Sequence, residues 1–145
     1  MDSNPKQVVF TTNADTPYGP LQLDLAIGPM VIELPPGPLI VCSIDINQRW
    51  VADMGLPGPD GGKGGKHVLV SPNFRGALPS IAYYIHRASS NRQIVGIRSL
   101  PVNGDVPAAK ARLSTVKIYP LDPKMAGAAM VGHHRKGAGW NAYPV

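Results

Sequence analysis

The chain has 145 residues, enough for one domain with a substantial core, and its 43% hydrophobic and 16% charged residues exclude a disordered polypeptide. Gly and Pro, at 16 each, make about a fifth of the chain, which excludes long helices and favours short strands joined by tight turns. It contains no apolar run of about 20 residues, so no membrane span is predicted. The N-terminus lacks the basic and apolar regions of a secretory signal, and we therefore expect a cytoplasmic location if Met1 is the native start.

The charge is divided unevenly between the two halves of the chain. Residues 1–60 carry two bases and seven acids, whereas residues 61–145 carry twelve bases and two acids. A basic half is a feature of nucleic-acid-binding proteins, but here the bases are dispersed and no aromatic recognition motif accompanies them. We therefore expect acidic and basic strands within one domain and no nucleic-acid partner. Cys42 lies in an apolar run without a CxxC motif, which predicts a structural thiol and no zinc site.

The predicted elements are mostly short strands. Runs rich in β-branched residues, or alternating between apolar and polar, predict strands at 8–11, 21–25, 30–34, 39–46, 66–70, 81–87, 93–100 and 116–119. Asp105 as an N-cap and Pro107 in the first turn predict one short helix to about Ser114. Residues 52–66 are expected to form a long loop.

This pattern predicts a mainly β fold, an antiparallel β-sandwich or barrel-like domain of about eight short strands with one short helix. The expected single domain covers residues 1–123, and residues 124–145 are expected to be a loosely ordered tail rich in Gly and Ala. The absence of a strand–helix–strand rhythm excludes a Rossmann-like fold.

The segment 55–66 is rich in glycine and contains Lys63 and Lys66. Glycine-rich loops can bind anions through their backbone N–H groups, so the two lysines are candidate anion-binding residues. The glycine spacing does not match a P-loop, and no Ser or Thr follows either lysine. The alternative is a structural loop that needs positive φ at several positions.

The four histidines are His67, His86, His133 and His134. None lies in an HExxH, HxH or Cys/His arrangement, so no metal site and no cofactor are predicted.

A first polar cluster surrounds Pro17 and contains Asn13, Asp15, Thr16 and Tyr18. These residues either shape a turn through local hydrogen bonds or line a pocket, where Asp15 could act as a base and Tyr18 as a hydrogen-bond donor.

A second polar cluster follows the most apolar predicted strand and contains Asp45, Arg49 and Trp50. Arg49 can bind a carboxylate or phosphate through two hydrogen bonds, and Trp50 can stack on a ligand. The competing account is a buried ion pair of Arg49 with Asp45 or Asp53. We expect the two clusters to meet on one concave surface.

Several stretches together resemble a known family. They are Thr12–Tyr18, Leu23–Leu25, Gly28–Val31, Arg49–Asp60, Gly62–Lys66, Arg98, Val102–Asp105 and Ile118–Leu121. They are similar to domain-of-unknown-function family twelve-fifty-four, which usually forms the N-terminal half of bacterial two-domain proteins completed by family twelve-fourteen. The resemblance implies a mainly β fold that packs on a second β-rich domain.

The two ends depart from the family pattern. Members usually carry a helical segment of several tens of residues before the Asn-Ala-Asp-Thr motif, whereas twelve residues precede Asn13 here. The segment after Leu121 does not resemble the family's continuation into a second domain, so we expect a truncated member.

Two functional hypotheses follow. The chain is either a small-molecule-binding β domain that supplies half of a two-domain enzyme site, or a structural and interaction module. In the second case the exposed sheet packs on a partner domain or on another copy, and the chain has no catalysis of its own.

Overall fold

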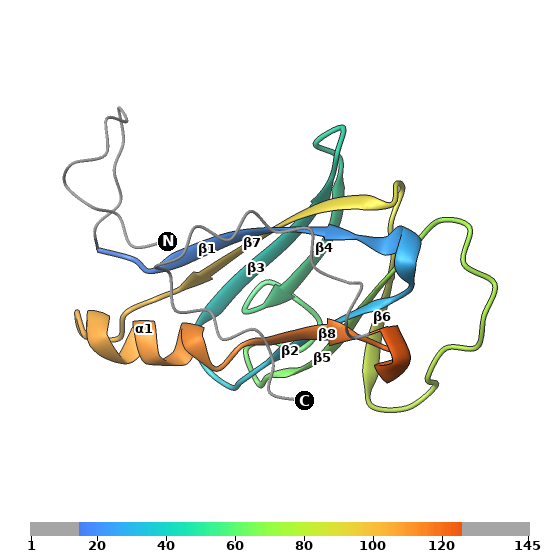
Figure 1. The fold of residues 1–145 in the computed structure, drawn as a ribbon. Helices are drawn as coiled ribbons and strands as arrows, with labels where there is room; N and C mark the ends of the chain where they lie inside the picture. The colour runs from blue at the N-terminus through green and yellow to red at the C-terminus, as the bar shows by residue number, and fades with distance from the viewer. Residues whose placement is uncertain (1–14, 126–145) are drawn as a thin grey trace.

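A computed structural model describes residues 15–125 and shows two four-stranded sheets stacked as a β-sandwich (Figure 1). Sheet A has the strand order β1-β7-β3-β4, and sheet B has the order β6-β5-β2-β8. The strands are β1 (Tyr18–Asp24), β2 (Met30–Leu34), β3 (Leu39–Asp45), β4 (Trp50–Gly55), β5 (Gly65–Val70), β6 (Tyr83–Arg87), β7 (Arg92–Ser99) and β8 (Lys117–Pro120). The predicted mainly β fold with about eight strands is confirmed, and within residues 15–125 the sheets remain separate rather than closing into a barrel.

Most predicted strands lie within one or two residues of the observed ones, and the strand at 30–34 has the predicted bounds. The strand predicted at 8–11 lies outside the described residues. The loop predicted from residue 52 is wrong over its first four residues, because β4 continues to Gly55. Ala52 and Met54 point into the core, but a β-bulge where β4 meets Ser43 and Ile44 disturbs the alternation.

Sheet B departs from the antiparallel prediction in one pair of strands. β5 and β6 run parallel, whereas the other paired strands are antiparallel. Parallel neighbours need a connection of about a dozen residues, and here residues 71–82 supply it. After this connection, β6 pairs with β5 at the edge of sheet B and runs in the same direction as β5.

The core lies between the two sheets. Leu39, Val41 and Ile97 of sheet A and Met30 and Leu69 of sheet B are at most 1% exposed. Burying each such side chain contributes roughly 1.5–3 kcal/mol. Because side chains alternate along a strand, the neighbours of these sheet A residues point away from sheet B, and they form the outer face of sheet A.

The single α-helix among the described residues, α1 (Val106–Ser114), begins where the sequence predicts. The Asp105 side chain caps it by accepting a hydrogen bond from the Ala108 amide at 2.9 Å. Arg112 ties the helix to β7 by donating to the Ser99 hydroxyl and the Leu100 carbonyl, both at 3.2 Å. Two 3₁₀ turns, Leu25–Ile27 and Pro123–Met125, complete the described elements, and no helix in this part of the chain is long and apolar enough to cross a membrane.

Candidate functional site

The outer face of sheet A contains a shallow hollow of about 240 Å³. Its floor is Gly96 in the middle of β7, where a Cβ atom would meet nothing within 4 Å. The strand register places Tyr18 and Ile40 on either side of Arg98 in one row, and Pro20 and Cys42 on either side of Gly96 in the next. The residues that line the hollow are Tyr18, Pro20, Ile40, Cys42, Gly96, Ile97 and Arg98.

Arg98 supplies the charge of this hollow. It is the one ionised side chain among the lining residues, and the described part of the chain offers it no carboxylate in an ion pair. A guanidinium beside apolar walls can hold a carboxylate or phosphate through two parallel hydrogen bonds. The hollow therefore combines an apolar floor with one donor group, the combination found in small-molecule sites.

Cys42 and Asp53 lie beside each other across β3 and β4. Burial raises the pKa of the Cys42 thiol above its ordinary value, and the negative charge of the neighbouring Asp53 raises it further. The thiol is therefore protonated at neutral pH, which makes it a poor nucleophile. Asp53 places a carboxylate on β4, two strands from the Gly96 floor of the hollow.

The third row of the face is largely apolar. Ile94 of β7 pairs with Ile44 of β3, and Ile44 in turn pairs with Trp50 of β4. Ile94 is 36% exposed and Trp50 is 66% exposed. Exposed apolar side chains that are adjacent on one face are a feature of binding surfaces.

The first predicted cluster adjoins the hollow in part. Tyr18 lies on its rim, and Asp15 and Thr16 lie in the bend that precedes β1. Asn13 lies outside the described residues. That these residues bind a ligand stays a prediction.

The second predicted cluster forms the tip of the β3–β4 hairpin. The buried Asp45 carboxylate accepts hydrogen bonds from the amides of Asn47 at 2.8 Å and Arg49 at 2.9 Å, and from the Ser89 hydroxyl at 2.6 Å. The Ser89 hydrogen bond, followed by that of the Arg49 amide, lowers the pKa of Asp45. These contacts organise the hairpin, and Arg49 reaches Asp45 through its backbone rather than through an ion pair.

The expectation that the two clusters meet is wrong. Tyr18 and Ile40 both pair with Arg98, so they lie at the same height along the strands of sheet A. Leu23 and Asp45 both pair with Gln93, five residues further along their strands. Five residues along a strand span about 17 Å, so the clusters lie at opposite ends of sheet A. Trp50 alone of the second cluster lies on the outer face, beside Ile44.

The two lysines of the glycine-rich segment lie apart from this face. Lys63 is exposed, and Lys66 at the start of β5 lies 5.7 Å from the centre of the Tyr83 ring. The amides of Gly61, Gly62 and Lys63 already donate to backbone carbonyls of the same loop. Anion binding by the lysines stays a prediction, while the positive φ angles of five glycines between residues 55 and 65 fit the structural alternative.

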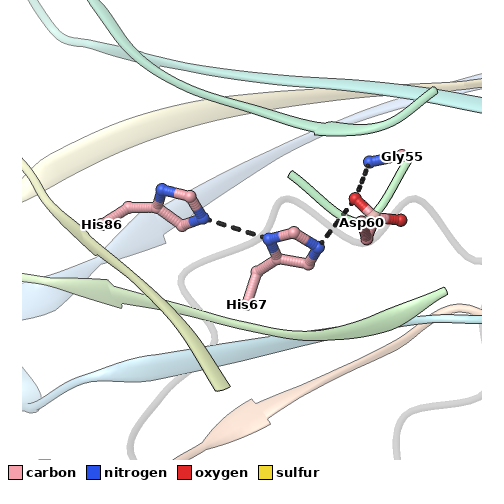
Figure 2. A network of polar contacts seen from close by, with 4 residues as sticks. All are labelled: Gly55, Asp60, His67 and His86. Carbon is pink, nitrogen blue, oxygen red and sulfur yellow. Dashed lines mark hydrogen bonds and ion pairs between the residues drawn. The ribbon is translucent and has the colours of Figure 1, made fainter. Parts of the chain in front are cut away.

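A histidine relay, which sequence reasoning missed, links the β4–β5 loop to His67 of β5, which is buried, and to His86 of β6, which is half-buried (Figure 2). Nδ1 of His67 lies 3.0 Å from Nε2 of His86, and Nε2 of His67 faces Asp60 Oδ1 at 3.3 Å. Asp60 also accepts a hydrogen bond from the Gly55 amide at 2.7 Å. The His67 ring is stacked on His86 and on Tyr84, with ring centres 5.3 and 4.9 Å apart.

Burial dominates the protonation of this relay. It lowers the pKa of His67 from about 6.5 to about 4, against the opposing charge of Asp60, and it also lowers the pKa of His86. Both rings are therefore neutral at pH 7. The relay fixes the β4–β5 loop to β5 and β6. The one sequence signal for it was the placement of His67 and His86 in neighbouring strands, which requires the parallel pairing to be known.

Comparison with known proteins defines the family. The chain matches the family described as "Protein of unknown function (DUF1254)" over residues 1–120. The chain belongs to this family. Among solved structures it is similar to the VPA0106 protein from Vibrio parahaemolyticus, with 21% identity and a TM-score of 0.71. The match covers 94% of this chain and 34% of that one, so the chain spans about a third of the length of this relative. No curated protein matches the chain.

Proposed function

We propose that this chain is a small-molecule-binding domain whose binding surface is the hollow over Gly96 on the outer face of sheet A. The observation that carries the proposal is an apolar depression with a single guanidinium, that of Arg98, at its rim. A flat apolar molecule would cover the floor, and an anionic group would bind Arg98. The hollow is shallow, which fits the hypothesis of a half-site that a second domain, such as the predicted one of family twelve-fourteen, completes.

The probe for this proposal is 8-anilinonaphthalene-1-sulfonate, an aromatic anion whose fluorescence rises in apolar sites. We expect one saturable site in the full chain. Gly96→Leu fills the hollow without meeting other atoms near its Cβ, and Arg98→Gln removes the charge, so each should lower the affinity about tenfold. Arg92→Gln is the matched control, because Arg92 lies on the outer face of the same strand but away from the hollow. Equal affinity in all four proteins, with unchanged circular dichroism, would refute the proposal.

A second candidate function is self-association through the same face. The third row exposes Ile94 and Trp50. Arg92 and Arg98 lie on β7, between Asp24 on the edge strand β1 and Asp53 on the opposite edge strand β4. A second copy related by a two-fold axis would set acids against arginines and bury the apolar row. This candidate predicts a concentration-dependent dimer in sedimentation velocity that Ile94→Glu abolishes. A wild-type chain that stays monomeric at all concentrations would exclude it.

A further inference from the structure

We infer that the ligand of this face is an apolar anion with a hydrogen-bond donor at its far end, a hydroxy acid of about the size of one aromatic ring with a short side chain. This inference rests on the proposed function and extends it from the presence of a site to the chemistry of its ligand. Its basis is the placement of Arg98 and Asp53 on opposite sides of one apolar strip.

The register fixes the separation of the two charges. Arg98 pairs with Ile40 on β3, and Asp53 on β4 pairs with Cys42, two residues further along β3. Two strand spacings and two residues of strand give a Cα separation of about 12 Å. Both side chains belong to the outer face, so they approach a ligand on the strip between them from its two ends.

The middle of the strip offers no charge to a ligand. Gly96 and Cys42 lie between the two ends, and the raised pKa of the Cys42 thiol keeps it uncharged at neutral pH. Pro20 and Ile40 flank this middle section with apolar surface. A planar hydrocarbon body is complementary to it, because a bulky body would stand out of so shallow a hollow into water.

The two ends select against other charge patterns. A cation would be repelled by Arg98, and a dianion of this length would bring its second negative group against Asp53. A hydroxyl group can donate to the Asp53 carboxylate, a charge-assisted hydrogen bond that a plain hydrocarbon end leaves unmade. The ends therefore favour one anionic group and one donor.

Isothermal titration of the full chain with three acids that share one body tests this inference. The probes are 3-(4-hydroxyphenyl)propanoate, 3-phenylpropanoate, which lacks the hydroxyl, and 3-(4-carboxyphenyl)propanoate, which carries a second anion. We expect the hydroxy acid to bind about fivefold more tightly than the phenyl acid and about tenfold more tightly than the dianion. Arg98→Gln should weaken all three acids about tenfold.

Asp53→Ala is the decisive variant, with Gln22→Ala, on the same face but away from the strip, as its control. The preference for the hydroxy acid should disappear in Asp53→Ala and persist in Gln22→Ala. Three acids that bind equally, or a hydroxyl preference that survives in Asp53→Ala, would overturn the inference while leaving the proposed function intact. If neither these acids nor the fluorescent anion binds, the proposed function itself fails and the inference with it.

Discussion

The two polar regions of this sandwich differ in whether their polar groups contact one another. In the relay, Asp60 and His67 are buried together, and the carboxylate also holds the Gly55 amide. On the outer face of sheet A, Arg98 lies beside apolar walls without a carboxylate partner in the described part of the chain. Buried polar groups that contact one another hold elements of a fold together, whereas a charge beside an open apolar floor has bonding capacity left for a ligand. Within the relay, Oδ2 of Asp60 and Nε2 of His67 still have no hydrogen-bond partner among the described residues. The two regions should therefore respond differently to substitution.

Substitutions of two glycines should give the largest difference in stability between the two regions. Gly55 has a φ of +78° and an added Cβ would lie 2.3 Å from the Leu39 carbonyl oxygen, so Gly55→Ala should destabilise the fold by about 3 kcal/mol. Gly96→Ala should leave stability unchanged or raise it by about 0.5 kcal/mol, because the site is open and alanine reduces unfolded-state entropy. Urea unfolding of both variants measures the difference. Similar losses in the two would mean that the hollow is packed by something in the protein.

Alanine substitutions of two aspartates, one in each region, should also differ in their effect on stability. Asp60→Ala removes the acceptor of the buried Gly55 amide and the partner of His67, and should cost about 2–3 kcal/mol in the free energy of unfolding. Asp53→Ala, on the outer face, should cost less than about 0.5 kcal/mol. Chemical denaturation with both variants checks this ordering. A loss in Asp53→Ala as large as that in Asp60→Ala would assign Asp53 to the framework rather than to a ligand.

The relay also predicts how stability depends on pH. In the folded chain the pKa of His67 is about 4, whereas in the unfolded chain it returns to about 6.5. Between these values the unfolded state binds more protons, so stability is lost as the pH falls from about 6.5 to about 4. With some allowance for screening, the loss should be about 2 kcal/mol at pH 4 relative to pH 7. His67→Gln, which cannot take up a proton, should flatten this part of the stability profile, and an equally steep profile in that variant would contradict the assignment.

The smallest expected effect is a change in the alkylation rate of the Cys42 thiol. Because the charge of Asp53 contributes to its raised pKa, Asp53→Asn should lower that pKa and speed alkylation by N-ethylmaleimide a few-fold at pH 8. The reaction is specific, since Cys42 is the single cysteine of the chain. Gln22→Ala, which leaves Asp53 in place, should alkylate at the wild-type rate. An unchanged rate in Asp53→Asn would show that burial alone sets the thiol's reactivity.

The sequence predicts the elements of this fold well and their arrangement less well. Short apolar runs identified β2 and β3, alternation identified β1, and the Asp105 cap with Pro107 identified α1, because these signals are local. No strand was predicted at the position of β4 (Trp50–Gly55), where a bulge interrupts the alternation. The parallel pairing of β5 with β6 was missed because it depends on a long connection rather than on residues within either strand.

The candidate site is assembled from strands that are distant in the sequence, so few of its residues can be identified from the sequence alone. Tyr18 and Trp50 were identified and lie on the outer face of sheet A, but Arg98 and Gly96 were not, since their role depends on the strands on either side of β7. Asp45 and Arg49 were selected for their chemistry and instead organise a hairpin. Polar residues that follow a strand are as often turn residues as ligand-binding ones, and only the register separates the two roles.

Protection of Cys42 from alkylation tests the central claim most directly, because its thiol lies at the edge of the hollow's floor. The rate of modification by N-ethylmaleimide would be followed by mass spectrometry at increasing concentrations of 8-anilinonaphthalene-1-sulfonate, in the wild-type chain and in Arg98→Gln. We predict at least fivefold slower modification of the wild-type thiol when the probe is saturating, and little protection in Arg98→Gln at the same probe concentration. A modification rate that saturating probe leaves unchanged would contradict binding over Gly96.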